Sequence, residues 1–141
     1  MRRKRVYRYY CEHCKKSNCS LPAMRKHERR CTMNPERECG MCMAAENYQI
    51  SVRELTSLLP NPNDYLIKTE WGDEFHANFD KALKPALEAL RSKADNCPAC
   101  ILAAIRQAGI PVPAVRDFNF TAECKTFWND INPSDHTGEY Y

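Results

Sequence analysis

Residues 9–31 read YYCEHCKKSNCSLPAMRKHERRC and hold four of the nine cysteines of the chain, two of its four histidines and six lysines or arginines. Three explanations of this composition compete: a metal site, a disulfide-linked knot, or a nucleic-acid-binding finger that depends on a metal for its fold. Two residues separate Cys11 from Cys14, twelve lie between Cys14 and His27, and three lie between His27 and Cys31. The pattern C-x2-C-x12-H-x3-C therefore offers four nitrogen and sulfur ligands, the set that structural zinc prefers.

The spacing of these residues has a geometric meaning. A tight turn between the first two cysteines directs both thiolates at one ion. His27 and Cys31 are four residues apart, so both lie on one face of a helix. Two alternatives remain open: Cys31 is spare and Cys19 or His13 is the fourth ligand, or the first cysteine pair shares its zinc with a later pair.

The segment resembles the two-Cys two-His zinc finger family in its CCHC variant, with Cys31 as the last ligand. The resemblance covers residues 7–31, about a sixth of the chain. Tyr9 stands where the family has an aromatic residue, Met24 where it has leucine, and Asn18 where it has a buried aromatic residue. The resemblance therefore implies a zinc finger whose own apolar core is smaller than usual.

In that family, bases are contacted from the start of the helix and from positions three and six residues further along. The resemblance places these roles on Ser20, Ala23 and Lys26, a poor set for reading sequence because only the lysine engages guanine well. Basic residues surround these positions, which favours phosphate contact without strong sequence preference. The residues expected to contact nucleic acid are Arg2, Arg3, Lys4, Arg5, Arg8, Arg25, Lys26, Arg29 and Arg30.

Two further CxxC pairs, Cys39 with Cys42 and Cys97 with Cys100, are separated by 54 residues. Paired CxxC units indicate zinc. Closing such a loop costs roughly 3.5 kcal/mol plus a constant, whereas a structural zinc supplies about 10–16 kcal/mol. We therefore predict a second, four-cysteine zinc site, similar to treble-clef sites, so that the chain binds two structural Zn²⁺ ions.

Other roles for the cysteines have less support. Cys97-Pro-Ala-Cys100 also resembles a thioredoxin-type redox pair, but that pair needs a preceding strand, and here a helical stretch precedes it. We expect Cys19 and Cys124, which remain, to be small buried residues. No nucleophile or phosphate-binding glycine loop accompanies the acidic cluster at residues 70–76, and filled structural zinc sites have no open position, so we predict no enzymatic activity.

Charge divides the chain. Residues 1–38 contain twelve Lys/Arg and four Asp/Glu, a net of +8, whereas residues 39–141 contain nine and fourteen, a net of −5. The basic head predicts an anionic partner, either nucleic acid or an acidic protein surface. No apolar run suits a membrane span and no secretory signal is visible. We therefore expect an intracellular protein, cytoplasmic or nucleoid-associated and not secreted, with reduced thiols.

The clearest predicted helix covers residues 73–95, where Pro85 should kink it or split it. Its apolar residues recur at helical spacing and should form one core-facing side: Phe75, Phe79, Leu83, Leu87 and Leu90. Shorter helices are expected at residues 51–60, with a capping box at the start, and at the last CxxC pair, with a glycine near its end. A short strand at residues 65–68 and an extended segment at residues 110–115 complete the body.

The predicted fold class is mostly α with small zinc-stabilised β knuckles, a zinc finger joined to a helical body. We expect residues 1–38 to form the basic CCHC finger with an N-terminal arm, and residues 39–125 to form a helical body closed by the second zinc. Residues 126–141 should form an aromatic tail, partly flexible at its end, whose aromatic residues pack on the body.

From Cys11 to Cys42 the pattern also resembles small phage- or bacterium-encoded zinc proteins, a resemblance that assigns no activity. We predict a non-enzymatic zinc protein that associates with nucleic acid as a regulator or accessory factor. The alternative is a zinc-stabilised protein-interaction adaptor, such as an assembly component or an inhibitor of a host enzyme.

Overall fold

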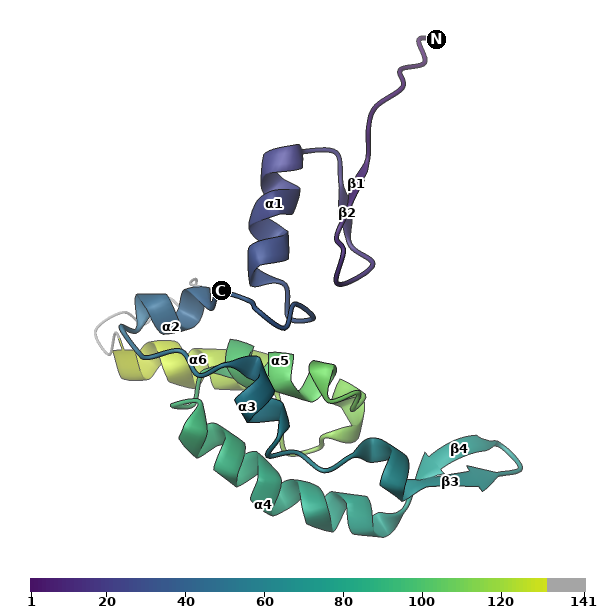
Figure 1. Ribbon diagram of the computed structural model, residues 1–141, viewed down its shortest axis with the longest axis vertical. Coiled ribbons are helices and arrows are strands. Elements are labelled where there is room, and N and C mark those ends of the chain that lie inside the picture. The colour runs from purple at the N-terminus through teal and green to yellow at the C-terminus, as the bar shows by residue number, and fades with distance from the viewer. Residues whose placement is uncertain (132–141) are drawn as a thin grey trace.

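The computed structural model describes residues 1–131, which are about half helical and contain two small antiparallel sheets. This agrees with the predicted mostly α class. The finger is a separate lobe beside the helical body, and the N-terminal arm extends away from it (Figure 1). The flexible end that the sequence predicts, residues 132–141, lies outside the described residues.

The finger begins with two short antiparallel strands, β1 (Tyr9–Tyr10) and β2 (Ser17–Asn18), followed by helix α1 (Leu21–Arg30). Ser20 caps α1 because its side chain accepts a hydrogen bond from a first-turn amide. Met24, which is 2% exposed, packs against the cysteines of the finger. The apolar core of the finger is therefore small.

From residue 39 to residue 131, where the description of the chain ends, the body contains five α-helices. They are α2 (Gly40–Ala44), α3 (Val52–Thr56), α4 (Ala77–Lys93), α5 (Pro98–Gln107) and α6 (Phe120–Ile131), with 3-10 turns η1 at Pro62–Tyr65 and η2 at Val112–Ala114. Helix α5 packs against α3 and α6 (Figure 1). Its Ile101, Ala104 and Ile105 are 0% exposed, and the alanine lets neighbouring elements approach closely. Helix α5 is therefore the centre of the core.

Strands β3 (Leu66–Thr69) and β4 (Gly72–Phe75) form an antiparallel hairpin that projects from the body (Figure 1). Gly72 has a φ of +120°, a conformation that glycine adopts without strain. The hydroxyl of Thr69 donates to the carbonyl of Gly72 and accepts from the amide of Trp71, at 2.6 and 3.3 Å. The tip of the hairpin is therefore ordered by its own hydrogen bonds.

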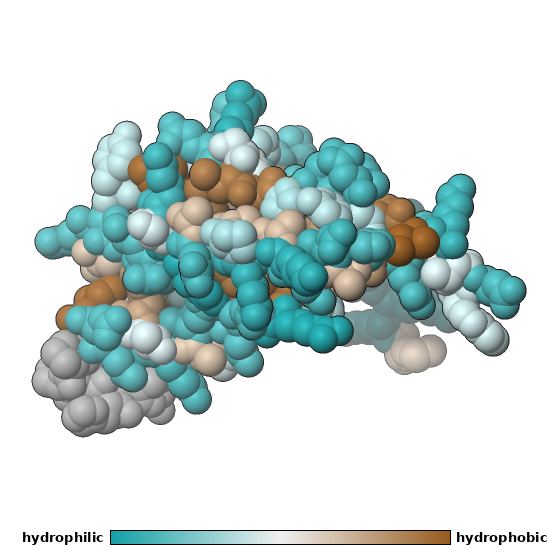
Figure 2. Space-filling model, turned by 90° about the horizontal axis from the view of Figure 1, so that it is seen from below, coloured by the Kyte–Doolittle hydropathy of each residue, from teal (hydrophilic) through white to brown (hydrophobic). Residues whose placement is uncertain are grey.

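The surface on the underside of the body is mostly hydrophilic, with hydrophobic side chains between the polar ones (Figure 2). At the hairpin end of this view, hydrophobic and hydrophilic side chains lie side by side. Leu66 and Ile67 are each 42% exposed, and Trp71 is 91% exposed. The hairpin therefore presents apolar side chains to solvent.

Three local features differ from the sequence prediction. Helix α4 is not split at Pro85, one of the two outcomes that the sequence predicts, because buried Leu83 and Leu87 on either side of the proline hold the helix against the core. Phe75 lies at the end of β4 rather than on the helix, and it stacks on Phe79 with ring centroids 4.6 Å apart. The extended segment predicted after α5 instead contains the 3-10 turn η2.

Helix α6 runs through residue 125, where a boundary between body and tail is expected from the sequence. Phe127 is buried in the core, and Trp128 packs against it. The prediction that aromatic residues near the C-terminus pack on the body is thus confirmed for these two. The residues up to Ile131 continue the body as a helix.

Hydrogen bonds hold the segment between the finger and the body. The side-chain amide of Gln107, at the end of α5, donates to the carbonyls of Thr32 and Asn34, at 2.8 and 2.9 Å. The backbone amide of Glu38 donates to the carbonyl of Arg29 at 2.8 Å. The segment is therefore bound to both parts, and the orientation of the finger is fixed.

Candidate metal centres and basic surface

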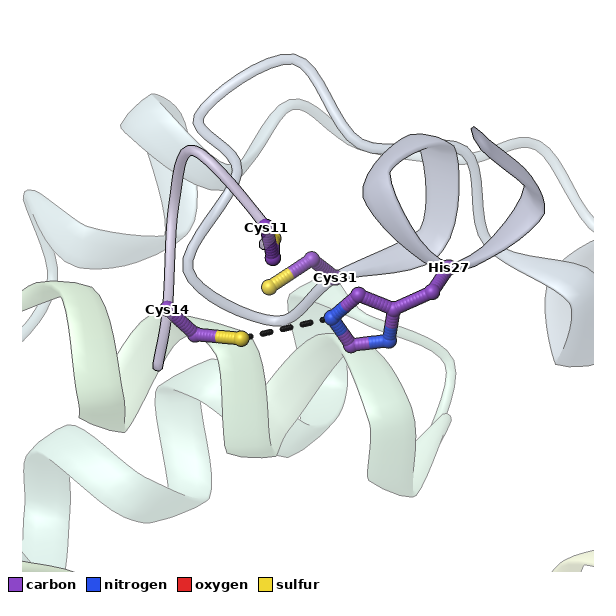
Figure 3. Close-up of side chains that lie close together, drawn as sticks. All are labelled: Cys11, Cys14, His27 and Cys31. Atoms are coloured by element: carbon purple, nitrogen blue, oxygen red, sulfur yellow. Dashed lines mark hydrogen bonds between the residues drawn. The ribbon is translucent and has the colours of Figure 1, made fainter. Parts of the chain in front are cut away.

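The first quartet collects its ligands from three parts of the finger. Cys11 follows β1, Cys14 lies in the turn before β2, His27 lies in α1 and Cys31 is the C-cap of that helix. Their side chains point toward one another (Figure 3), and the four ligand atoms lie within 4.8 Å of one another. Nε2 of His27 is 3.3 Å from Sγ of Cys14. The arrangement brings together the four residues that the spacing predicts.

The chemistry of these side chains suits a metal. Backbone amides two residues further along donate to Sγ of Cys11 and of Cys14, both at 3.4 Å, which orients both sulfur atoms in the turn. Burial lowers the pKa of His27, so its imidazole is neutral and can coordinate. Burial raises the pKa of Cys31 to about 11, so metal binding at Cys31 displaces a proton.

The alternative ligands that the sequence leaves open lie outside the quartet. Cys19 is exposed, so the prediction that it is a small buried residue is wrong, and its Sγ is 3.9 Å from the guanidinium of Arg8. His13 contributes its backbone amide to the turn and is not part of the cluster. The cysteine pair of the finger lies with His27 and Cys31 rather than with a pair from the body.

The second quartet joins two helix N-termini that are distant in the sequence. Cys39 is the N-cap of α2 and Cys42 lies in the first turn, and Cys97 and Cys100 hold the same two places in α5. The sulfur atoms of Cys39 and Cys97 are 3.4 Å apart, and those of Cys42 and Cys100 are 3.5 Å apart. All four residues are between 0% and 2% exposed.

The distances suit zinc and exclude disulfide bonds. With Zn–S bonds of about 2.3 Å, sulfur atoms at the corners of a tetrahedron are about 3.8 Å apart, whereas a disulfide needs about 2.05 Å. All nine cysteines are free. The two quartets can therefore hold metal, and their donor sets, three cysteines with one histidine and four cysteines, are compatible with two structural zinc ions.

A buried cation supports the assignment of the second quartet. Among residues 1–131, Arg37 is the only buried charged residue, at 6% exposed, and no carboxylate in that range pairs with it. Its Nη1 lies 3.9 Å from Sγ of Cys100, and its Nε donates to the carbonyl of Arg30 at 3.4 Å. An unpaired buried charge costs several kcal/mol, whereas four thiolates around a divalent ion carry a net charge of about −2. A filled four-cysteine centre is the counter-charge that Arg37 otherwise lacks.

The thiols of the second quartet share protons when no metal displaces them. Hydrogen bonding with Cys100 lowers the pKa of Cys39, and the same bond raises the pKa of Cys100. Metal uptake must release these protons, so metal affinity falls as the pH falls.

All nine basic residues that the sequence assigns to nucleic acid are exposed, and within residues 1–131 none forms an ion pair with an acidic side chain. Arg25 and Arg29 line a shallow pocket with His13, Glu28 and Asn34. Arg30 lies over the start of α2, where a Cβ added at the first residue of the helix would be 3.3 Å from its Nη1. The basic residues therefore occupy the finger and its arm, and only Arg30 reaches the body.

Sequence reasoning missed three residues that support the centres. Met33 packs on the apolar core of the finger. The side chain of Gln49 accepts from the amide of Cys39 at 2.7 Å and donates to the carbonyl of Arg37 at 2.6 Å. The third residue is Arg37, which lies near the second quartet. No sequence signal marks a glutamine in a loop, and Arg37, as an arginine in a basic segment, is expected to be solvated. Their proximity to the cysteines is visible only in three dimensions.

Comparisons with known proteins give no further assignment. No family model matches the chain, and no curated protein or solved structure matches it either. Within residues 1–131, no helix combines the length and apolar character needed to cross a bilayer. The function must therefore be argued from the two centres and the surface around them.

Proposed function

We propose that this chain is a non-enzymatic zinc protein whose two structural ions hold a basic finger that binds nucleic acid, acting as a regulator or accessory factor. One observation carries the proposal: nine arginines and lysines of the finger and its arm are exposed and have no acidic partner within residues 1–131. Each quartet supplies four protein ligands, so a bound zinc has no open position for catalysis.

The proposed contact is with phosphates more than with bases. On α1, Arg25 and Arg29 are four residues apart and share one side of the helix, and Lys26 and Arg30 share the neighbouring side. Phosphate contacts orient a protein on nucleic acid and carry no sequence information. The finger therefore supplies affinity that depends on salt.

A salt titration tests the proposal. Affinity of the zinc-loaded protein for a short duplex, measured by fluorescence anisotropy, should fall linearly with the logarithm of salt, with a slope of about −0.9 per phosphate neutralised. Reversing Arg25, Lys26 and Arg29 to glutamate should abolish binding. The matched control changes Lys81, Lys84 and Lys93, three exposed lysines of α4, to glutamate. This variant should bind the duplex as the wild type does.

Equal affinity of both triple variants and the wild type would contradict the proposal. Zinc content of each variant, measured by native mass spectrometry, distinguishes loss of charge from loss of the finger fold.

The hairpin favours a second candidate function, a protein-interaction adaptor. Residues 64–76 contain one lysine and four acidic residues, a net of −3, while the other residues between 39 and 131 balance at eight of each sign. An ordered, exposed tryptophan beside acidic residues is typical of an anchor in a protein interface. This end of the molecule repels phosphate, so its partner differs from that of the finger.

Replacing Trp71 with alanine separates the two functions. As an exposed residue it contributes little to the fold, so the variant should remain folded and bind nucleic acid as the wild type does. The adaptor function predicts that a partner recovered with the wild-type protein is lost with this variant and retained when exposed Tyr48 is changed instead. Retention by both variants would exclude the hairpin as the anchor.

A further inference from the structure

The N-terminal arm and β1 carry two aromatic side chains that the finger does not use. Tyr7 is 84% exposed and Tyr10 is 65% exposed, whereas Tyr9 between them is partly buried against the finger core. Alternation along an extended chain explains the difference between Tyr9 and Tyr10, since neighbouring side chains of a strand point to opposite faces. The two exposed rings are thus available to a ligand.

The backbone under these rings is partly ordered. Tyr10 pairs with Ser17 in the finger sheet, and the amide of Cys11 donates to the carbonyl of Lys16 at 2.9 Å. Nε of Arg8 donates to the hydroxyl of Ser17 at 2.9 Å. The first metal centre follows directly, so a filled centre holds Tyr10 and Arg8 in a fixed position on the finger.

Cations flank the two tyrosines in the sequence. Residues 1–20 contain seven lysines or arginines and one acidic residue, a net of +6. All seven cations are exposed. Exposed rings between exposed cations match the chemistry of an unpaired nucleic-acid strand, whose bases stack on aromatic rings while its phosphates follow the positive charges.

We propose that Tyr7 and Tyr10, with the cations near them in the chain, are two separate stacking positions for single-stranded nucleic acid. A duplex hides the faces of its bases in its own stack, so only an unpaired strand offers faces to these rings. The weak base-reading set on α1 is consistent with this division: the helix holds phosphates and the arm holds bases. The inference rests on the proposed nucleic-acid function and names its substrate class.

The test uses the zinc-loaded full chain and three labelled probes of equal length: an oligothymidylate, an oligonucleotide of abasic sites, and a duplex. Abasic sites keep the phosphates and remove the stacking faces. The wild type should bind oligothymidylate more tightly than the abasic probe, roughly 5- to 100-fold for each stacked base. Changing Tyr7 or Tyr10 to alanine should remove this preference by the same factor, and changing either to phenylalanine should preserve it.

Controls separate stacking from charge and from folding. Tyr48 is 83% exposed in the body, so changing it to alanine should have no effect on any probe. The alanine variants should keep both zinc ions, and their affinity for the abasic probe and the salt dependence of binding should match those of the wild type.

Two results would overturn the inference. If the wild type binds the abasic probe as tightly as oligothymidylate, or if both alanine variants keep the preference, the rings do not stack on bases. In that case, loss of binding on reversing Arg25, Lys26 and Arg29 still supports the phosphate-binding finger. If the wild type binds none of the three probes, both proposals fail.

Discussion

The finger and the body each surround a four-ligand centre, but they depend on it differently. In the finger, the buried apolar side chains are Cys11, Met24 and Cys31, two of which are ligands. In the body, the cysteines lie within a cluster that also contains fully buried Leu55 and Leu90. One centre takes the place of a hydrophobic core, and the other adds to one. We therefore expect metal at the first quartet to be a condition for folding of the finger, and metal at the second quartet to reinforce a core that the body already has.

Removing the metal should give the largest effect and the clearest contrast. Structural zinc contributes about 10–16 kcal/mol to finger peptides. After chelation, amide resonances of residues 9–31 should lose their dispersion in NMR spectra, while those of α4 and α6 keep theirs because apolar packing remains. Native mass spectrometry should show two zinc ions lost.

Returning zinc to the chelated protein is the control and should restore both sets of resonances. Survival of the finger resonances after both ions are lost would show that the finger has a core of its own, against the contrast drawn above.

The second prediction concerns the cation behind the body centre. Changing Arg37 to methionine leaves the charge of the four thiolates without its buried partner, which should cost about 3–5 kcal/mol. The midpoint of urea unfolding, followed by circular dichroism with zinc present, should fall accordingly. Arg53 is exposed, so the same change there should have little effect. Equal midpoints of urea unfolding for the two variants would show that Arg37 does not balance the charge of the body centre.

Truncation of one buried side chain in each part tests the two cores. Leu90 is 0% exposed and Met24 is 2% exposed, and each change to alanine should cost about 2–5 kcal/mol. The loss should appear in different measurements: a lower unfolding midpoint for the Leu90 variant, and weaker zinc binding by the finger, in competition with a chelator, for the Met24 variant. If the Met24 variant binds zinc as tightly as the wild type does, Met24 does not support the metal.

The smallest expected effects come from a matched pair of substitutions at two helix N-caps. Ser20 caps α1 in the finger and Ser51 caps α3 in the body, each by accepting from an amide three residues later. Each change to alanine should cost about 1 kcal/mol. We expect the Ser20 variant to lose zinc affinity at the first centre about fivefold and the Ser51 variant to keep it, because folding and metal binding are coupled in the finger. Reduced affinity in both variants would indicate that the two parts fold together.

The sequence predicts most of what depends on local spacing. Each CxxC pair, the cap of α3 and the proline at the start of α5 follow from residues a few positions apart, and the union of the two distant pairs follows from their shared spacing. It fails where distant packing decides the outcome. The helical state of residues 81–89 across Pro85 depends on the core that buries the flanking leucines. Likewise, Phe75 ends a strand because its ring stacks on Phe79.

The supporting residues of the centres could not be predicted for the same reason. Arg37 meets Cys100 across 63 positions of sequence, and Gln107 meets Asn34 across 73. Neither Arg37 nor Gln107 belongs to a motif. A contact of this kind depends on how the finger is placed on the body, which no local pattern describes.

The separation of the body ligands also sets an order of events during synthesis. All four ligands of the finger exist once residue 31 has been made, whereas Cys39 must wait for Cys97, 58 positions later. At about 5–20 residues per second, that interval is roughly 3–12 s. During it, Cys39 and Cys42 lack their partner ligands on an incomplete chain, beside a finger whose four ligands have all been made. The ligand sets of the two centres are therefore completed one after the other during synthesis, that of the finger first.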